Sequence, residues 1–130
     1  FEQDGIQVVG EEYFFTPTRQ FADGSARISD VLQEGAANDA FMGNLNLRFN
    51  YEGVASEVSF LFGEFGGSQN LQVNGELLIT ESLTELDGKD IGGATIRVES
   101  INKEFRLTMV GEIKTFAVGG QEFFVDDVCW

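Results

Sequence analysis

Apolar and polar residues alternate along much of this 130-residue chain, and this two-residue period most limits what it can fold into. The alternation is clearest in one segment, where apolar residues hold the odd positions and polar residues the even ones: Leu45, Leu47, Phe49, Tyr51 against Asn44, Asn46, Arg48, Asn50. Successive side chains of a β-strand point to opposite faces, so the pattern predicts a strand with one buried and one polar face. Similar segments predict strands at residues 6–9, 11–15, 25–29, 44–51, 57–65, 70–73, 76–80, 94–100, 104–110, 113–118 and 122–129.

Glycine-containing dipeptides separate these segments and predict where the chain reverses. Asn74-Gly75 stands between two strand-like runs and suits a type I′ hairpin turn, in which both central residues need a positive φ. Gly119-Gly120 predicts a second hairpin, between residues 113–118 and 122–129. Residues 36–44 have the composition of a loop.

Helical patterning is scarce. Residues 82–85 have the form of a helix start that would end at Gly88, and residues 30–34 are a second candidate for a short turn of helix. Many short, evenly spaced strands are typical of sandwiches and barrels. We therefore expect an all-β fold, a two-sheet antiparallel jelly-roll β-sandwich with minimal helix. No Pro-, Ser- or Gln-rich linker interrupts the chain, so residues 1–130 are expected to form a single β-sandwich domain.

The chain is strongly acidic, with 22 acidic residues, 8 basic residues and a formal net charge of −14. A polyanion repels nucleic-acid phosphates and anionic lipid head groups, so neither is an expected partner. No apolar run approaches the roughly 18 residues of a membrane-spanning helix, so no membrane insertion is expected. The acidity has two interpretations: a solvated surface kept soluble by repulsion, or carboxylates that converge on a hard cation such as Ca²⁺.

The absence of histidine limits catalysis. The chain has no His-based triad or His general base, and Cys129 lacks the partner that usually activates a thiolate. Its Gly-rich turns match no phosphate-binding loop, and carboxylate pairs are uninformative among so many acids. We expect no enzymatic activity. Cys129 is the only cysteine and is expected to be a buried strand residue; a thiol that pairs with another chain is the alternative.

The two ends of the chain carry acidic motifs, Phe-Glu-Gln-Asp-Gly at residues 1–5 and Phe-Val-Asp-Asp-Val at residues 124–128. This pairing resembles the ends of extracellular jelly-roll modules, including MAM-type domains and several families of carbohydrate-binding modules. The resemblance implies an extracellular or cell-surface location, first and last strands that run side by side, and a structural calcium ion. Carried over to this chain, it makes Glu2 and Asp126 side-chain ligands of calcium, with Asp4 and Asp127 as further candidates.

Asp126 also points to a cation on physical grounds. The last predicted strand is largely apolar on both faces, which carry Phe124, Asp126, Val128 and Trp130 on one side and Phe123, Val125, Asp127 and Cys129 on the other. An ionised carboxylate in an apolar row is costly unless a cation pairs with it, and the chain has few basic residues. The alternative is that one aspartate points to solvent while the other caps a turn.

These observations favour a non-catalytic extracellular module for binding or adhesion, with a carbohydrate as its expected ligand and calcium as a stabilising ion. Sugar recognition usually needs exposed aromatic rings beside polar groups, for which Tyr13, Tyr51, Trp130 and the polar strand face of residues 44–50 are candidates. That face can equally be a solvated outer surface, so no ligand-binding residue is assigned.

The alternative function is a structural or assembly module of a surface fibre or matrix protein. Adjacent phenylalanines at 14–15 and 123–124 force one ring of each pair away from the core side of its strand. Outward rings, Cys129 and the apolar tail of residues 128–130 are compatible with self-association or with contact to another protein module.

Overall fold

The computed structural model describes residues 2–3, 5–21, 23–35 and 38–130, without the side chains of residues 2, 3 and 21. The described chain is all-β and its strand pairs are antiparallel, as the alternation predicts. Its strands are β1 (Glu2–Gln3), β2 (Ile6–Thr16), β3 (Arg19–Phe21), β4 (Ser25–Ser29), β5 (Asp39–Gly43), β6 (Leu45–Val73), β7 (Glu76–Thr80), β8 (Asp90–Ile91), β9 (Ala94–Ile101) and β10 (Glu104–Cys129). None of the described residues forms a helix long and apolar enough to cross a bilayer.

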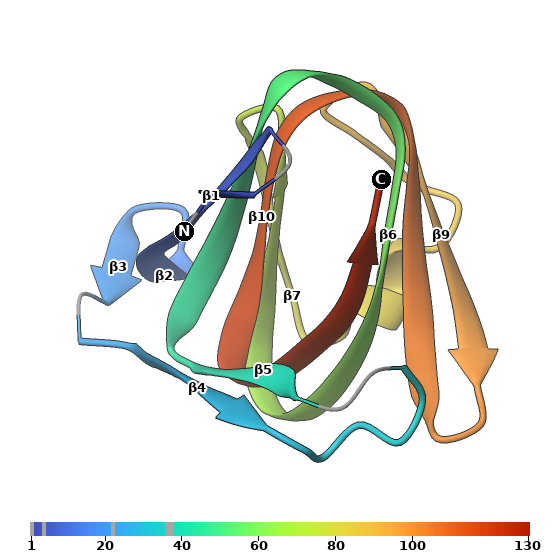
Figure 1. Ribbon diagram of the computed structural model, residues 1–130. Coiled ribbons are helices and arrows are strands. Elements are labelled where there is room, and N and C mark those ends of the chain that lie inside the picture. Colours follow the sequence, from blue (N-terminus) through green and yellow to red (C-terminus); the bar gives the residue numbers. More distant parts are fainter. Residues whose placement is uncertain (1, 4, 22, 36–37) are drawn as a thin grey trace.

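Two very long strands organise the fold, β6 with 29 residues and β10 with 26. Figure 1 shows both strands arching over together and descending on the other side. Each therefore pairs twice with the other: residues 116–120 of β10 lie between residues 45–49 and residues 69–73 of β6. Likewise, residues 61–62 of β6 lie between residues 105–106 and residues 125–126 of β10.

The arch divides the strand order into two halves. In the first half β2 pairs with residues 45–51 of β6, residues 115–120 of β10 follow, and residues 69–73 of β6 then pair with β7. In the second half β9 pairs with residues 104–110 of β10, residues 57–66 of β6 follow, and the C-terminal part of β10 then pairs with β5 and β5 with β4. β1 and β3 extend from β2, and β8 pairs with β9.

The sequence divides these long strands wrongly. The expected strands 57–65 and 70–73, and all of 44–51 except Asn44, belong to the single strand β6, and the hairpin predicted at Gly119-Gly120 lies inside β10. Both glycines are buried and pair with β6 on two sides, and a Cβ on Gly119 would overlap the carbonyl oxygen of Leu45. Glycine is needed here for close backbone approach, not for a reversal.

The Asn74-Gly75 hairpin is confirmed, because both residues have positive φ, at 49° and 89°, between β6 and β7. The helical turn after Ser82 is also confirmed in short form, as a 3₁₀ helix over Leu83–Leu86 whose N-cap Ser82 accepts the N–H of Thr84. Residues 30–34 are not helical. Part of residues 36–44 forms β5 and not the expected loop.

Residues 31–35, which we name the strap, do not form a helix, because buried carboxylates accept hydrogen bonds from their backbone N–H groups. Asp39 Oδ2 accepts the N–H groups of Val31 and Leu32, at 2.7 and 2.8 Å. The two carboxylate oxygens of Glu104 accept those of Gln33 and Glu34. Four successive amides are thus satisfied by side chains rather than by a helix or a sheet.

Phenylalanine rings from both halves meet in the core. Phe116 stacks on its strand partner Phe49 with ring centroids 4.5 Å apart, and on Phe60 at 5.9 Å. Phe60 lies in the second half of the strand order, so its contact with Phe116 joins the two halves. Buried residues of both halves form one apolar cluster.

The first and last strands are not paired neighbours. Within the described residues β1 pairs with β2, while the C-terminal part of β10 pairs with β5 and β6. The expectation that the first and last strands run side by side is therefore wrong. The two ends still approach each other, because Gly5, Ile6 and Trp130 line one shallow hollow of about 240 Å³.

Candidate functional site

An open groove of about 480 Å³ lies beside β2 on the first half of the fold. It is lined by Gly10, Glu11, Glu12, Phe14, Gln20, Arg48 and Gln72. Arg48 and Gln72 come from the two segments of β6 that flank β10, whereas the other five residues come from β2 and the β2–β3 hairpin. We name it the Arg48 groove.

Side chains from β6 hold the C-terminal part of β2 in place as one wall of the groove. The pairing of β2 with β6 ends at Glu12, and beyond it the amide of Asn70 bonds both backbone groups of Phe14, at 2.8 and 2.9 Å. Tyr13 is fully buried and donates its hydroxyl to the carbonyl of Ser68 at 2.8 Å. Asn46, also buried, donates to the carbonyl of Glu12 at 3.1 Å. The position of Phe14 is thus fixed by buried amides.

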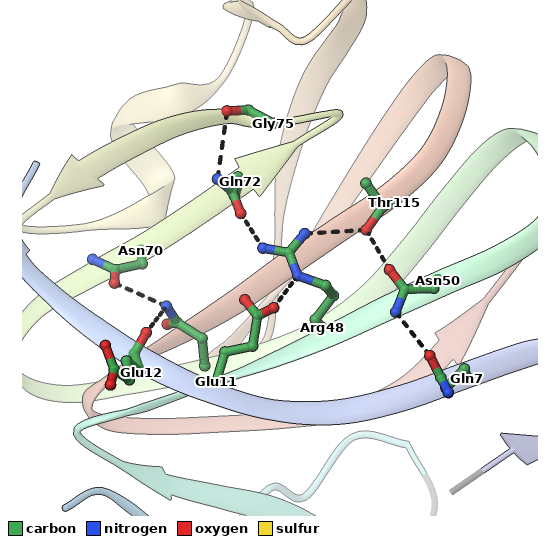
Figure 2. Close-up of polar contacts among 10 residues, drawn as sticks. Gln7, Glu11, Glu12, Arg48, Asn50, Asn70, Gln72, Gly75 and Thr115 are labelled. Carbon is green, nitrogen blue, oxygen red and sulfur yellow. Dashed lines mark hydrogen bonds and ion pairs between the residues drawn. The ribbon is translucent and has the colours of Figure 1, made fainter. Parts of the chain in front are cut away.

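Arg48 is the centre of a chain of polar contacts across the floor of the groove (Figure 2). Its Nε forms an ion pair with Glu11, its Nη2 donates to Gln72 Oε1, and its Nη1 donates to Thr115 Oγ1 at 3.1 Å. The side chain of Arg48 is 18% exposed and that of Glu11 33% exposed, so this pair is only partly solvated. A partly buried guanidinium with three fixed partners is rigid.

The contacts continue on both sides of Arg48. Gln72 Nε2 donates to the carbonyl of Gly75 at 3.4 Å, which fixes which way its amide points. On the other side Thr115 donates to Asn50 Oδ1 at 2.9 Å, and Asn50 Nδ2 donates to Gln7 at 3.3 Å. By contrast, the exposed side chains of Glu12 and Gln20 make no hydrogen bond to another described residue. The groove therefore combines a fixed polar floor, a half-buried aromatic ring and free polar groups at its rim.

The candidate sugar contacts have different environments. Tyr13 is buried in the wall, and burial raises the pKa of its phenol. Tyr51 is half-buried, and burial raises the pKa of its phenol as well. Trp130 is 58% exposed, lies 6.4 Å from Tyr51 between ring centroids, and lines the separate hollow beside Gly5.

The predicted polar strand face is only partly a solvated surface. Asn46 is buried, Arg48 and Asn50 carry the contacts of Figure 2, and Asn44 lies just before β6 with a φ of 53°. The sequence identified this row but missed Glu11 and Gln72, its partners. No local pattern marks them, because their contacts depend on how distant strands pair.

The predicted calcium ligands are not brought together among the described residues. The side chain of Glu2 and all of Asp4 lie outside the described part of the chain. Asp127 has a φ of 52° and forms an ion pair with Arg106 at 3.0 Å, and Asp126 Oδ1 accepts the N–H of Asp127 at 2.7 Å. The part of the chain that the structure describes contains no group of three or more acidic or cysteine side chains placed to hold a metal.

A different carboxylate, Asp39 at the start of β5, has an oxygen that finds no hydrogen-bond partner in the part of the chain that the structure describes. Asp39 is 1% exposed, and its Oδ1 is buried and accepts no hydrogen bond from the described residues. Ala40 of β5 pairs with Val125 of β10, so Asp39 and Asp126 lie opposite each other at the adjacent position of these two antiparallel strands. The strap lies close against Asp126: a Cβ added to Gly35 would lie only 2.7 Å from Asp126 Oδ2.

Cys129 is exposed, so the expectation of a buried cysteine is wrong. Val128 still packs against the core, whereas Cys129 lies on the exposed side of the strand, where its Sγ forms hydrogen bonds with the carbonyl and the carboxylate of Asp127. An exposed thiol loses little contact with water on folding and therefore contributes little to stability.

Comparison with protein-family models, with curated proteins and with solved structures finds no match for this chain.

Proposed function

We propose that the chain is a non-catalytic binding module that recognises a carbohydrate in the Arg48 groove. The observation that carries the proposal is the combination of an open groove, the half-buried ring of Phe14 and a polar floor whose members bond one another. An aromatic face can stack on a sugar ring while polar groups of fixed orientation meet its hydroxyls. A prearranged floor keeps the entropic cost of binding low.

The proposed architecture is the single two-sheet jelly-roll β-sandwich over residues 1–130 that the sequence predicts. Three observations support two facing layers: the double pairing of β6 and β10, the arch in Figure 1, and the stacking of Phe60 on Phe116 across the two halves. In this arrangement the Arg48 groove would lie on the outer face of the first layer. An extracellular or cell-surface location and a role in adhesion belong to the same proposal.

The proposal includes a structural calcium ion near Asp126. The buried Oδ1 of Asp39 supports it, because a buried carboxylate oxygen needs a proton, a donor or a cation. Melting with and without EDTA tests the ion, since a ligand of the folded state raises stability. EDTA should lower the Tm of the wild type but not that of Asp39→Asn, whereas Glu57→Gln, at an exposed acid, should respond like the wild type. A Tm that EDTA leaves unchanged would exclude calcium.

A glycan array followed by titration calorimetry tests the sugar site. Phe14→Ala and Gln20→Ala, which leave the Arg48 contacts intact, should weaken binding about tenfold or more. Trp130→Ala, which removes an exposed aromatic ring in another hollow, should leave affinity unchanged. Loss of binding in Trp130→Ala alone would move the site to the hollow beside Gly5, and silence across plant, algal and microbial glycans would refute carbohydrate binding.

A second candidate function is assembly with copies of the same chain. It is favoured by β4, which pairs in the described structure only with β5 and carries Ile28, a side chain that is 69% exposed. An unpaired strand edge with an exposed apolar side chain can accept another strand. Sedimentation at several concentrations, with and without reductant, separates strand pairing from a disulfide through Cys129, and a monomer under all conditions would exclude both.

A further inference from the structure

We propose that the Arg48 groove takes an uncharged glycan and discriminates against anionic ones. This inference rests on the proposed function and adds to it the chemical class of the sugar. It follows from which groups of the groove are already bonded, which are free, and what charge they carry.

Arg48 is the only basic residue among the described residues that line the groove, and three of its five N–H groups already donate to neighbouring side chains. Each of its three nitrogens bonds a different partner: Glu11, Gln72 and Thr115. Glu11 already neutralises the guanidinium, so a ligand carboxylate or sulfate would meet a neutral ion pair and not a free positive charge. Arg48 therefore orders the floor and is not a free receptor for anions.

The two carboxylates of the groove provide free hydrogen-bond acceptors. The carboxylate of Glu12 and the Oε2 of Glu11 accept no hydrogen bond from the described residues, whereas both the oxygen and the nitrogen of the Gln72 amide already take part in one. Gln20 at the rim is the one free amide among the described lining residues. A ligand that meets these groups must donate hydrogen bonds, as the hydroxyl groups of a neutral sugar do.

Charge acts in the same direction. Glu11 and Glu12 against Arg48 leave the lining with one net negative charge, and the whole chain carries −14. The groove and the surrounding surface both repel an anionic polymer. Salt screens this repulsion, since the Debye length falls to about 10 Å at about 0.1 M ionic strength. A neutral glycan meets none, so its affinity should hardly change with salt.

Titration calorimetry with two polymers of matched backbone and different charge tests the inference. Fully methyl-esterified and de-esterified homogalacturonan share one backbone and differ in charge, and neutral xylan and glucomannan extend the uncharged set. The uncharged polymers should bind with less than about a twofold change in affinity between low and high salt. The de-esterified polymer should bind at least about tenfold more weakly than its ester at low salt, and this gap should narrow as salt rises.

Variants at Glu12 separate the two roles of its carboxylate. Glu12 is exposed, so its replacement leaves the fold intact. Glu12→Gln keeps an acceptor and removes a charge, and it should narrow the gap between the two galacturonans. Glu12→Ala removes the acceptor as well and should weaken the neutral polymers, whereas Glu57→Gln, far along the chain in β6, should do neither.

The outcomes distinguish this inference from the proposed function. Tighter binding of the de-esterified polymer at low salt would overturn the inference and leave carbohydrate binding standing. Chitosan that binds more tightly than the neutral polymers, and that loses affinity in Phe14→Ala, would overturn it in favour of a cationic sugar. Silence of every polymer would overturn the proposed function and this inference with it.

Discussion

The side chain of Asn74 joins three separate turns of the structure. Its Nδ2 donates to the carbonyls of Gly92 and Glu112, at 2.8 and 2.7 Å. Its Oδ1 accepts the N–H groups of Lys114 and Thr115, at 2.8 and 3.3 Å. The amide thereby holds the β6–β7 turn against the β8–β9 turn and against the bend of β10.

Replacing Asn74 with Ala should cost about 3 kcal/mol of unfolding free energy. Four net hydrogen bonds at an exposed site are worth about 0.5 kcal/mol each, the low end of the usual range. Alanine adds about 1 kcal/mol because the residue has a φ of 49°, in the left-handed region that asparagine tolerates better. For a chain of this size the loss corresponds to a fall in Tm of roughly 10 °C.

Asn102 provides a matched control, since it has a φ of 55° but its side chain forms a single hydrogen bond among the described residues, to Glu34. Asn102→Ala should lose about 1 kcal/mol from the backbone and little more. Denaturation by guanidinium, followed by circular dichroism, measures both variants. Asn74→Asp should be as destabilised as Asn74→Ala, because a carboxylate would face two carbonyl oxygens. Equal losses in Asn74→Ala and Asn102→Ala would refute the argument.

Two further variants test the core and a buried acid. Phe116→Ala should lower the free energy of unfolding by about 4 kcal/mol, because the ring of Phe116 packs against three others. The control Phe65→Ala, at a ring that is 59% exposed, should lower it far less. Equal denaturation midpoints for the two variants would contradict the core assignment. Burial raises the pKa of Glu64, so its contribution to stability is full below its ordinary pKa of 4.5 and is lost as pH rises through the raised value. Glu64→Gln should therefore be at least as stable as the wild type at neutral pH and show a flatter profile of Tm against pH; a profile unchanged by the substitution would contradict the burial argument.

The positions of most strands follow from the sequence because alternation is local. The segments 76–80 and 94–100 match β7 and β9, and the Asn74-Gly75 turn lies where its residue types predict. What alternation cannot show is whether a glycine between two strands reverses the chain. At Gly119 it does not, because the absence of a Cβ serves the close approach of Leu45 from the neighbouring strand. A turn and a close approach between two backbones both require glycine, so the sequence alone does not show which of the two a given glycine serves.

The sequence predicts only part of the Arg48 groove, for a related reason. Alternation placed Arg48 on a polar strand face, but its partners Glu11, Gln72 and Thr115 lie 37, 24 and 67 residues away. Those separations are decided by strand pairing, and each one-residue slip would turn a partner to the other face. The site is a consequence of the doubled pairing between β6 and β10, which no local pattern encodes.

The calcium hypothesis changes position for a physical reason. Acidic motifs near chain ends are weak indicators of a cation, because exposed carboxylates are satisfied by water, and Asp127 is satisfied by Arg106. Asp39 is the stronger indicator, since a carboxylate that is 1% exposed cannot turn to water for its second oxygen. It escaped notice because residues 36–44 read as a loop, where an aspartate needs no explanation. The structure places Asp39 in β5, beside the strand that carries Asp126, and there its buried carboxylate does need an explanation.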